Sequence, residues 1–385
     1  MPNRKQRAKI AQETIEILGR GNYQNRLGEI VDLSDAITNS KDRSIHYDSF
    51  YRVFDDLHRL VRTLPDQKIE FSVTNETTLH AARRLIEIDG ESEILCLNFA
   101  SAMNPSGGFL SGSQAQEESL ARATALYPCL AQMNKMYEKN RRLDSPLFTD
   151  DMIYSPQVPV FRDDNDILLD KPFSISIVTA PAVRANALVK PEEIQELQKE
   201  IFGRTEKLLS IAAIHGHKVL VLGAWGCGVF GNNPSQVAKD FHYHLTENYL
   251  LNKCFTKVIF AILDRSNDTI APFWEVFTDS SINWKYKLEN LFDSFVHQNS
   301  LEFAADYMVE FSGEDLPTHE NYVYLIESAI VNCQENKTTA MEAINSGCGY
   351  TPQSIEETLR LLNELYCLYS QAYERYLAEA QSVVE

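Results

Sequence analysis

The chain has 385 residues, 44% of them hydrophobic, and a formal net charge of −18 at pH 7. This length and apolar fraction suffice for one large or two smaller folded domains. The acidity disfavours direct binding to free nucleic acid, and no apolar run reaches the roughly eighteen residues of a membrane span. The basic start MPNRKQRAK lacks the apolar stretch of a signal peptide, so we expect a cytoplasmic or otherwise intracellular protein.

Cysteines and histidines form no pattern typical of a metal site or a disulfide framework. The seven cysteines are scattered, odd in number and without CxxC spacing, so we expect reduced thiols. His215 and His217 precede a predicted strand, and His242 and His244 are two residues apart on a predicted helix, so they do not share a face. We predict no metal and no cofactor.

A strand, a glycine turn and two adjacent carboxylates follow one another between residues 94 and 126. Residues 94–99 have the apolar clustering of a buried strand, and the turn sequence NPSGG at 104–108 ends it. Ser113 and Gln116 fit a capping box, which predicts a helix with Glu117 and Glu118 in its first turn. The paired acids are then expected beside a loop whose glycines let the backbone approach a ligand closely.

Glu117 and Glu118 allow two interpretations. As ordinary first-turn residues they are favoured by the helix dipole. As a catalytic pair, the charge of Glu117 and a bound phosphate would raise the pKa of Glu118 toward neutrality, as a general acid requires.

Residues 127–172 are rich in proline, aspartate and aromatic residues and predict a long irregular insertion. Residues 218–223 (KVLVLG) then predict a buried parallel strand, followed by a second glycine loop at 224–234 and a helix over 235–245. Asn233 is a plausible N-cap with Pro234 at the first helical position. Loop amides at a helix N-terminus form a typical phosphate cradle.

The second loop also matches a dinucleotide-binding pattern. Gly226, Gly228 and Gly231 form GxGxxG, and the following strand at 258–263 ends at Asp264, where a ribose-binding acid could lie. This pattern keeps a nicotinamide-dependent oxidoreductase open as the less favoured alternative. The spacing to Asp264 is longer than the usual twenty or so residues.

The C-terminal hundred residues differ in composition from the rest. Residues 286–385 hold four basic and seventeen acidic residues, a net charge of −13, which leaves −5 for the preceding 285. Helical apolar spacing recurs at 284–296, 321–331, 354–369 and 371–384. The acidic face is either a solvated surface or a binding site for a protein partner, and the tyrosines of this segment suit either an interface or a helical core.

Both glycine loops together resemble those of the microbial-type poly(ADP-ribose) glycohydrolases, a branch of the macrodomain fold with a GGG…QEE motif. Ser106-Gly107-Gly108 stands for the triple glycine, Gln116-Glu117-Glu118 for the acid motif, and LGAWGCGVFGN for the second phosphate loop. Residues 175–181 are similar to another family strand, and residues 7–18, 22–23 and 31–33 to the leading helix and hairpin. The resemblance covers roughly residues 4–280.

The resemblance implies a site for ADP-ribose or poly(ADP-ribose), with the diphosphate between the two loops. Glu118 takes the place of the catalytic acid, which protonates the leaving 2′-oxygen, and Glu117 holds the ribose hydroxyls. Asn104 is a candidate distal-ribose contact or a local turn residue, and Phe230 packs either on the ligand or over the core. Tyr154, Phe161 or Arg162 are candidates to wall the adenine, or are ordinary loop packing. The expected substrate-binding residues are Asn104, Gly107, Gly108, Gln116, Gly226, Cys227, Gly228, Val229, Phe230 and Gly231.

Ser106 departs from the family pattern, because glycine is usual at this position. If the residue has a positive φ, serine costs about 1 kcal/mol or more, and a negative φ makes it harmless. The departure leaves open a binder of ADP-ribose with poor turnover.

We therefore predict an α/β macrodomain-like mixed sheet flanked by helices, with an N-terminal helical segment and a C-terminal all-helical extension. Strands are expected near Ile69, Ile94, Phe173, Lys218 and Val258. Residues 1–285 form the catalytic domain and residues 286–385 the acidic extension. The predicted activity is hydrolysis of the ribose–ribose bond of poly(ADP-ribose), or removal of ADP-ribose from modified protein; the alternative is a catalytically weak ADP-ribose reader.

Overall fold

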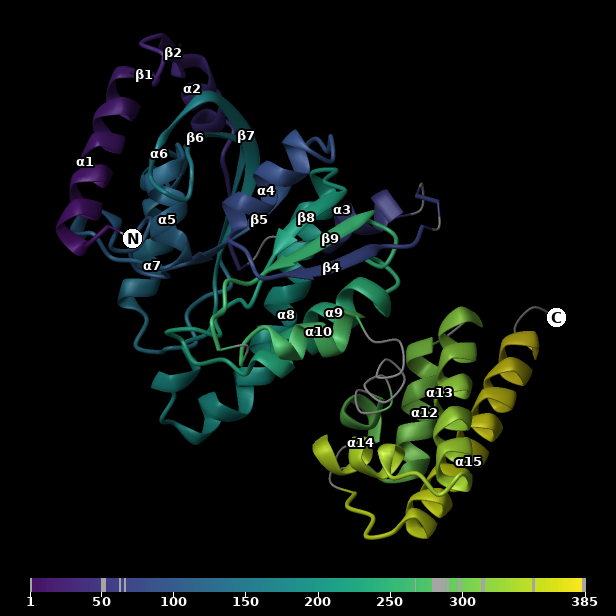
Figure 1. The fold of residues 1–385 in the computed structure, drawn as a ribbon. Helices are drawn as coiled ribbons and strands as arrows, with labels where there is room; N and C mark the ends of the chain where they lie inside the picture. Colours follow the sequence, from purple (N-terminus) through teal and green to yellow (C-terminus); the bar gives the residue numbers. More distant parts are fainter. Residues whose placement is uncertain are drawn as a thin grey trace. The chain divides into compact units, whose positions relative to one another are not determined.

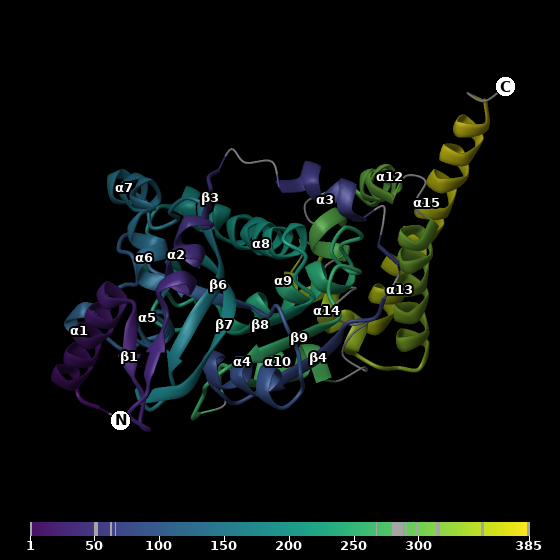
Figure 2. The ribbon, with the colours of Figure 1, turned by 90° about the horizontal axis from the view of Figure 1, so that it is seen from above.

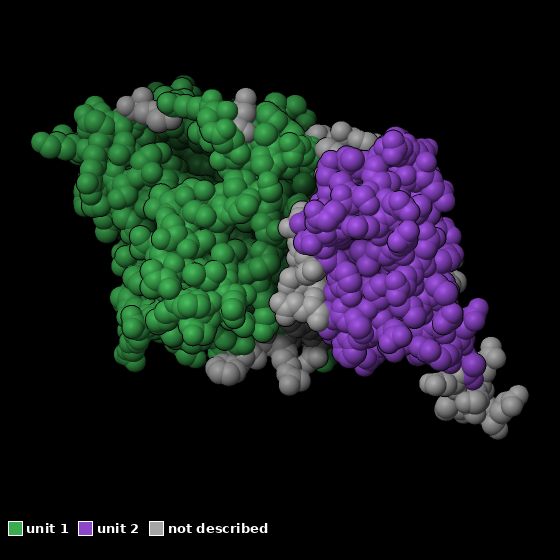
Figure 3. All heavy atoms as spheres, turned by 90° about the horizontal axis from the view of Figure 1, so that it is seen from below, with its two compact units in different colours: residues 1–278 green, residues 279–385 purple. Residues whose placement is uncertain are grey.

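The computed structural model describes residues 2–49, 53–61, 64–65, 67–266, 268–278, 288, 291–296, 299–312, 316–347 and 350–382. The chain divides into two compact units, Met1–Thr278 and Asp279–Glu385, which Figure 3 shows in different colours. Residues 279–287 lie outside the described part of the chain, so the functional boundary after residue 285 stays a prediction.

The N-terminal unit is built on a mixed seven-stranded sheet with the order β3-β6-β7-β5-β8-β9-β4 (Figure 1). The strands are β3 Ile45–Tyr47, β4 Glu70–Thr74, β5 Leu95–Ala100, β6 Met152–Arg162, β7 Leu168–Pro181, β8 Val219–Leu222 and β9 Lys257–Ala261. β7, β5, β8, β9 and β4 are parallel, whereas β6 runs antiparallel to both β7 and β3. The predicted α/β mixed sheet is confirmed.

Helices cover both faces of this sheet (Figure 2). Those of the unit are α1 Arg4–Arg20, α2 Ser34–Asp42, α3 Val53–Val61, α4 Thr78–Glu87, α5 Gln116–Ala123, α6 Leu126–Ala131, α7 Asn134–Arg142, α8 Pro191–Ile214, α9 Pro234–Thr246 and α10 Ala271–Thr278. Leu95 and Leu97 of β5 pack in one core with α3, α8, α9 and α10, and Cys96 packs in the other with α1, α2, α4, α5, α6 and α7. The alternation of buried side chains along β5 thus explains why its sequence is apolar throughout.

Several local predictions are confirmed. The leading helix is α1, and the hairpin consists of β1 Asn22–Gln24 and β2 Ile30–Asp32. α9 begins as expected, because the Asn233 side chain accepts hydrogen bonds from the amides of Ser235 and Gln236 and Pro234 follows at the first position. The five expected strands correspond to β4, β5, β7, β8 and β9.

The prediction of an irregular segment at 127–172 is wrong. It contains α6, α7, all of β6 and the start of β7. β6 includes Pro156 and Pro159, which argue against a strand in sequence. Pro156 lies where the register with β7 shifts between Ser155 and Val158, next to Gln157 with a φ of 48°, whereas Pro159 pairs in register with Ser174.

The C-terminal unit is helical in its described residues: η3 Phe292–Val296, α12 Leu301–Ser312, α13 Leu316–Gln334, α14 Thr339–Gly347 and α15 Ile355–Ser382. The two helices predicted at 354–369 and 371–384 are one continuous helix, α15, and the sequence missed α12 and α14. Tyr322 and Tyr369 are buried in this unit's own core, which favours core packing for these two tyrosines. Residues 284–287 and 289–290 of the helix predicted at 284–296 lie outside the described residues, and Phe292–Val296 form η3.

Candidate active site

The two glycine loops lie at the same edge of the sheet, because β5 and β8 are parallel neighbours and each loop follows the C-terminal end of its strand. A cavity of about 840 Å³ at this edge is lined by the second loop and the acid motif. Of the predicted site residues it is lined by Gln116, Glu117, Glu118, Gly226, Gly228, Val229 and Phe230. Ligands of α/β sheets typically bind at this end of the strands.

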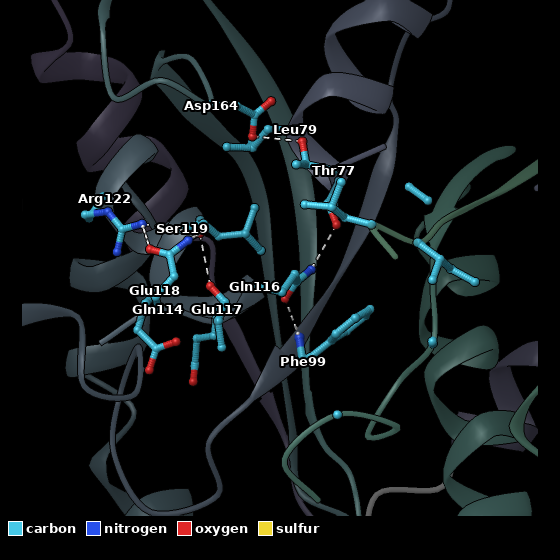
Figure 4. Close-up of a pocket in the computed structure, with 18 of the residues that line it drawn as sticks. Thr77, Leu79, Phe99, Gln114, Gln116, Glu117, Glu118, Ser119, Arg122 and Asp164 are labelled. Atoms are coloured by element: carbon cyan, nitrogen blue, oxygen red, sulfur yellow. Dashed lines mark hydrogen bonds between the residues drawn. The ribbon is translucent and has the colours of Figure 1, made fainter. Parts of the chain in front are cut away.

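Gln116 fixes the start of α5 against the end of β5. Its Oε1 accepts a hydrogen bond from the Phe99 amide at 2.9 Å, and its Nε2 donates to the Leu97 carbonyl at 2.7 Å (Figure 4). The predicted capping box is wrong: Ala115 occupies the N-cap position, and no side chain caps the helix. Gln116 therefore anchors the acid motif to the sheet, because both ends of its side-chain amide are bonded to β5.

Glu117 is almost completely buried, at 3% exposure. Its carboxylate accepts hydrogen bonds from the Ser101 amide at 2.7 Å and from Nδ2 of Asn98 at 3.3 Å. Burial raises the pKa of Glu117 to about 8, and the neighbouring charge of Glu118 adds to this. The sequence argument expected a raised pKa on Glu118, whereas the structure gives Glu117 the burial that raises one.

Glu118 is 9% exposed and lies against the first glycine loop. Its Oε1 accepts a hydrogen bond from the Gly108 amide at 3.0 Å, while its buried Oε2 has no partner among the described residues. A Cβ on Gly107, which has a φ of 58°, would lie 2.5 Å from Oε1. The glycine is thus required for close approach of this loop to the carboxylate.

In the first loop, the amides of Gly107 and Gly108 donate hydrogen bonds to other groups of the protein. Gly107 donates to the Asn104 carbonyl and Gly108 to Glu118, and neither glycine lines the cavity. Ser106 has a φ of 59°, is fully buried, and its hydroxyl has no partner in the described structure. The φ of Ser106 is therefore positive, and serine at this position is under the backbone strain that a positive φ imposes on a residue with a Cβ.

The second loop has the opposite arrangement. The carbonyls of Gly226, Gly228, Val229 and Phe230 all accept hydrogen bonds from the protein. The amides of these same four residues donate to no acceptor within the described residues, and all four residues line the cavity. A run of unpaired backbone amides is an anion-binding concavity, which suits a diphosphate.

The remaining predicted residues lie around this centre. Asn104 is exposed and does not line the cavity, so its contact with a distal ribose stays a prediction. Gly231 has a φ of 70° and turns the second loop toward α9. Cys227 does not line the cavity, and burial raises the pKa of its thiol to about 12, which leaves it unreactive at neutral pH.

Sequence reasoning missed part of the cavity wall. Phe99 and Thr78 line it from the end of β5 and the start of α4, and the turn Asp163 to Asp166 lines it from the β6–β7 connection. The proposed adenine wall is wrong in detail: Phe161 and Tyr154 are buried in the two cores, and Tyr154 stacks on His215 at 3.6 Å. Arg162 is also buried and outside the cavity lining, which in this turn consists of residues 163–166.

The dinucleotide reading of GxGxxG is not supported. The sheet is mixed and not the all-parallel sheet of a dinucleotide fold, and β6 runs against its neighbours. Asp264, the candidate ribose acid, accepts hydrogen bonds from the amides of Ser266, Thr269 and Ile270 in its own loop. Within the described residues, no three histidine, cysteine, aspartate or glutamate side chains are grouped as a metal site would require, and no helix is long and apolar enough to span a bilayer.

Comparison with known proteins gives a consistent set of relatives. The family model for the microbial-type PARG catalytic domain matches residues 11–163. The structure of poly(ADP-ribose) glycohydrolase from Thermomonospora curvata is 41% identical, covers 70% of this chain and 98% of its own, and has a TM-score of 0.64. Its complex with the inhibitor ADP-HPD has the same identity and coverage and a TM-score of 0.63.

The corresponding enzyme from Deinococcus radiodurans, solved in complex with ADP-ribose, is 40% identical. It covers 62% of this chain and 95% of its own, with a TM-score of 0.57. No curated protein sequence matches the chain significantly.

Proposed function

Because the chain belongs to the family of microbial-type poly(ADP-ribose) glycohydrolases and is a hydrolase of poly(ADP-ribose), we propose that Glu118 is its catalytic acid. The observation that carries this assignment is the geometry of its carboxyl group. Glu118 lines the cavity. Its Oε1 accepts a hydrogen bond from the Gly108 amide, and its Oε2 has no hydrogen-bond partner among the described residues. In this proposal the buried Oε2, which no protein group bonds in the described structure, carries the proton that the glycosidic oxygen receives.

ADP-ribose binds across the cavity with its diphosphate on the second loop. The four amides of Gly226, Gly228, Val229 and Phe230 supply donors without a protein acceptor, and neutralise the anion locally in an acidic chain. Gly107 and Gly108 support the acid instead, because Gly108 bonds Glu118 and Gly107 leaves room for it. Phe230 lines the same cavity and contributes its ring as an apolar surface for the ligand.

In the reaction, Glu118 protonates the 2′-oxygen of the leaving ribose as the bond to the anomeric carbon breaks. The ribose develops oxocarbenium character, which the bound diphosphate stabilises. Water attacks the anomeric carbon and returns a proton to the Glu118 carboxylate. One acid suffices, since two consecutive helical residues point about 100° apart and cannot face each other across a bond.

Glu117 has a positioning role in this proposal. Both of its oxygens are held, by Asn98 and by the Ser101 amide, next to the acid. Its raised pKa, about 8, keeps Glu117 neutral near pH 7, so it places no second negative charge beside Glu118 or the diphosphate. The ribose hydroxyls are the groups that Glu117 would contact from this position.

The test is the release of free ADP-ribose from poly(ADP-ribosyl)ated and mono(ADP-ribosyl)ated protein, comparing the native chain with Glu118→Gln. Binding of ADP-ribose by both proteins is established first by calorimetry. Loss of release by about 100-fold or more in the variant supports Glu118 as the acid. Binding without release by the native chain would instead identify a reader of ADP-ribose, and the preferred substrate decides between polymer and single ADP-ribose.

The cavity-lining residues all belong to the unit Met1–Thr278, which we assign as the catalytic domain. A role of the acidic helical extension 286–385 in binding an ADP-ribosylated or other protein partner stays a proposal, motivated by its charge of −13. An intracellular location is likewise proposed, from cysteines that are unpaired in the described structure.

A further inference from the structure

Asn186 bonds two successive carbonyls of the second loop from outside the cavity. It lies in the short turn Ala185–Ala187 after β7, is exposed, and does not line the cavity. Its Nδ2 donates to the Val229 carbonyl at 2.7 Å, and its own amide donates to the Phe230 carbonyl at 3.1 Å. Within the described residues, the Val229 and Phe230 carbonyls each accept a hydrogen bond from Asn186 and from no other residue.

The bond to Val229 determines the direction of a cavity-facing amide. The Val229 carbonyl and the Phe230 amide belong to the same planar trans peptide group, in which C=O and N–H point in opposite directions. A donor that holds the carbonyl on the outer side therefore directs the Phe230 N–H to the inner side, toward the cavity. Phe230 N–H is one of the four amides without a protein acceptor among the described residues.

The other end of the loop is held in a different way. Asn232 is buried, and its Nδ2 donates to the Gly226 carbonyl at 3.1 Å and to the Val183 carbonyl at 2.8 Å. Gly226 is thus fixed by the loop's own residue and by the core. Val229, at 76% exposure, has no such buried support, so the outer part of the loop depends on Asn186.

We propose that Asn186 is a positioning residue for the diphosphate of ADP-ribose. It acts through the Val229–Phe230 peptide, which it orients so that the amide faces the anion, and it touches neither the substrate nor Glu118. This inference deepens the proposed function and rests on the assignment of the second loop as the diphosphate site. The amides of Gly226, Gly228 and Val229 still hold the diphosphate beside the ribose when the Phe230 amide turns away, so the loss of this one contact affects KM more than kcat.

The experiment uses the full chain with Asn186→Ala, which removes the side-chain donor, and Asn186→Asp, which keeps the shape but replaces the donor by a carboxylate. Asn22→Ala is the matched control, since Asn22 is outside the cavity lining and its Nδ2 also donates to a main-chain carbonyl, that of Arg20. The measurements are KM and kcat on poly(ADP-ribose), and calorimetric affinities for ADP-ribose and for adenosine, which lacks the diphosphate.

Asn186→Ala is expected to raise KM and the Kd for ADP-ribose about 5- to 10-fold, with kcat within about twofold and adenosine affinity unchanged. Asn186→Asp is expected to raise both further, because its charge repels the diphosphate. Unchanged ADP-ribose affinity in both variants, or an equal loss for adenosine, would overturn the proposal. If the native chain binds ADP-ribose but releases none from polymer, the proposed function fails while the binding measurements still decide the role of Asn186.

Discussion

The two glycine loops lie side by side at the ends of parallel strands, yet they use their backbone in opposite ways. The first loop directs amides to carboxylates, since Gly108 donates to Glu118 and the Ser101 amide just after β5 donates to Glu117. The second loop turns its carbonyls to the protein and leaves four amides without a protein acceptor in the described structure. Glycine in the first loop makes room for an acid, whereas in the second it shapes an anion site.

This difference teaches that a glycine-rich sequence does not by itself identify a phosphate site. Both loops satisfy the pattern from sequence, and only the direction of the peptide groups separates their roles. The comparison predicts that a variant that displaces Glu118 from the first loop damages the chemical step, whereas a variant that distorts the second loop damages ligand binding. Gly107→Ala and Gly226→Ala test this separation, and Glu117→Gln and Ser106→Gly test the energetic cost of the groups buried beside the first loop.

The largest effect is expected from Gly107→Ala in the first loop. The new Cβ would lie 2.5 Å from Oε1 of Glu118 and has to adopt a φ of 58°, so the carboxylate is displaced. We expect kcat to fall by about 100-fold or more, in line with the loss of a general acid, with the Kd for ADP-ribose within about threefold. Steady-state kinetics and calorimetry measure the two quantities.

Gly90→Ala is the control for Gly107→Ala, because Gly90 also has a positive φ, 71°, but nothing lies within 4 Å of its added Cβ. This control shows how much activity is lost through backbone strain alone, without displacement of the Glu118 carboxylate. An equal loss of activity in both variants, or a loss of ADP-ribose affinity in Gly107→Ala alone, would contradict the assignment of the first loop to the acid.

The next largest effect is expected from Glu117→Gln, because burial of the Glu117 carboxyl lowers the free energy of unfolding at neutral pH. Glu117 has its pKa raised from 4.5 to about 8, so the folded protein keeps a proton that the unfolded chain loses above pH 4.5. The free energy of unfolding of the native protein therefore decreases as pH rises from 4.5 to about 8. Glu117→Gln removes this decrease and is expected to raise the free energy of unfolding at pH 7 by about 2 kcal/mol while lowering activity.

Urea unfolding at several pH values between 4 and 9 measures this change. A variant whose stability keeps the same pH dependence as the native protein would show that Glu117 is ionised at neutral pH. Activity of the native enzyme is also expected to decline above about pH 8, where Glu117 loses its proton and its charge repels the bound diphosphate.

Gly226→Ala is expected to act on the second loop and to weaken binding. Its Cβ would meet Nδ2 of Asn232 at 2.3 Å and the Ala182 Cβ at 2.7 Å, at a φ of 74°. The Kd for ADP-ribose is expected to rise about 10-fold, with a smaller change in kcat than for Gly107→Ala. Gly90→Ala is again the control, because it has a similar φ, 71°, nothing lies within 4 Å of its added Cβ and it is outside the cavity lining; its affinity is expected to stay near the native value.

The smallest effect is a stabilisation by Ser106→Gly. This change relieves a φ of 59° and removes a buried hydroxyl without a partner among the described residues. We expect the free energy of unfolding to rise by about 1 kcal/mol, with activity retained. Ser111→Gly serves as comparison, since Ser111 has no positive φ and its Oγ donates to the Gly108 carbonyl, so it is expected to destabilise. A lower thermal midpoint for Ser106→Gly would show that the serine hydroxyl contributes a useful contact.

Much of the fold was predictable because its signals are local. Apolar runs gave β5, β8 and β9, and Asn233-Pro234 gave the start of α9 through a cap that depends on neighbours in sequence. β6 was not predictable, since Pro156 is accommodated at a bulge against β7 and Pro159 pairs with Ser174 of that strand, and both arrangements depend on the partner strand and not on local signals. The capping box at Ser113 failed because the sheet binds the Gln116 side chain instead.

The sequence by itself determined the family, the acidic pair and the two glycine loops, because each is a short pattern whose chemistry lies in residue type and order. The tertiary structure decided what each group does. Packing buries Glu117 and so raises its pKa. The Gly108 amide holds Oε1 of Glu118 and leaves the buried Oε2 without a partner in the described structure, and Asn186, 43 residues before Val229, orients the second loop. Burial and peptide direction arise from contacts between distant segments, which no local pattern encodes.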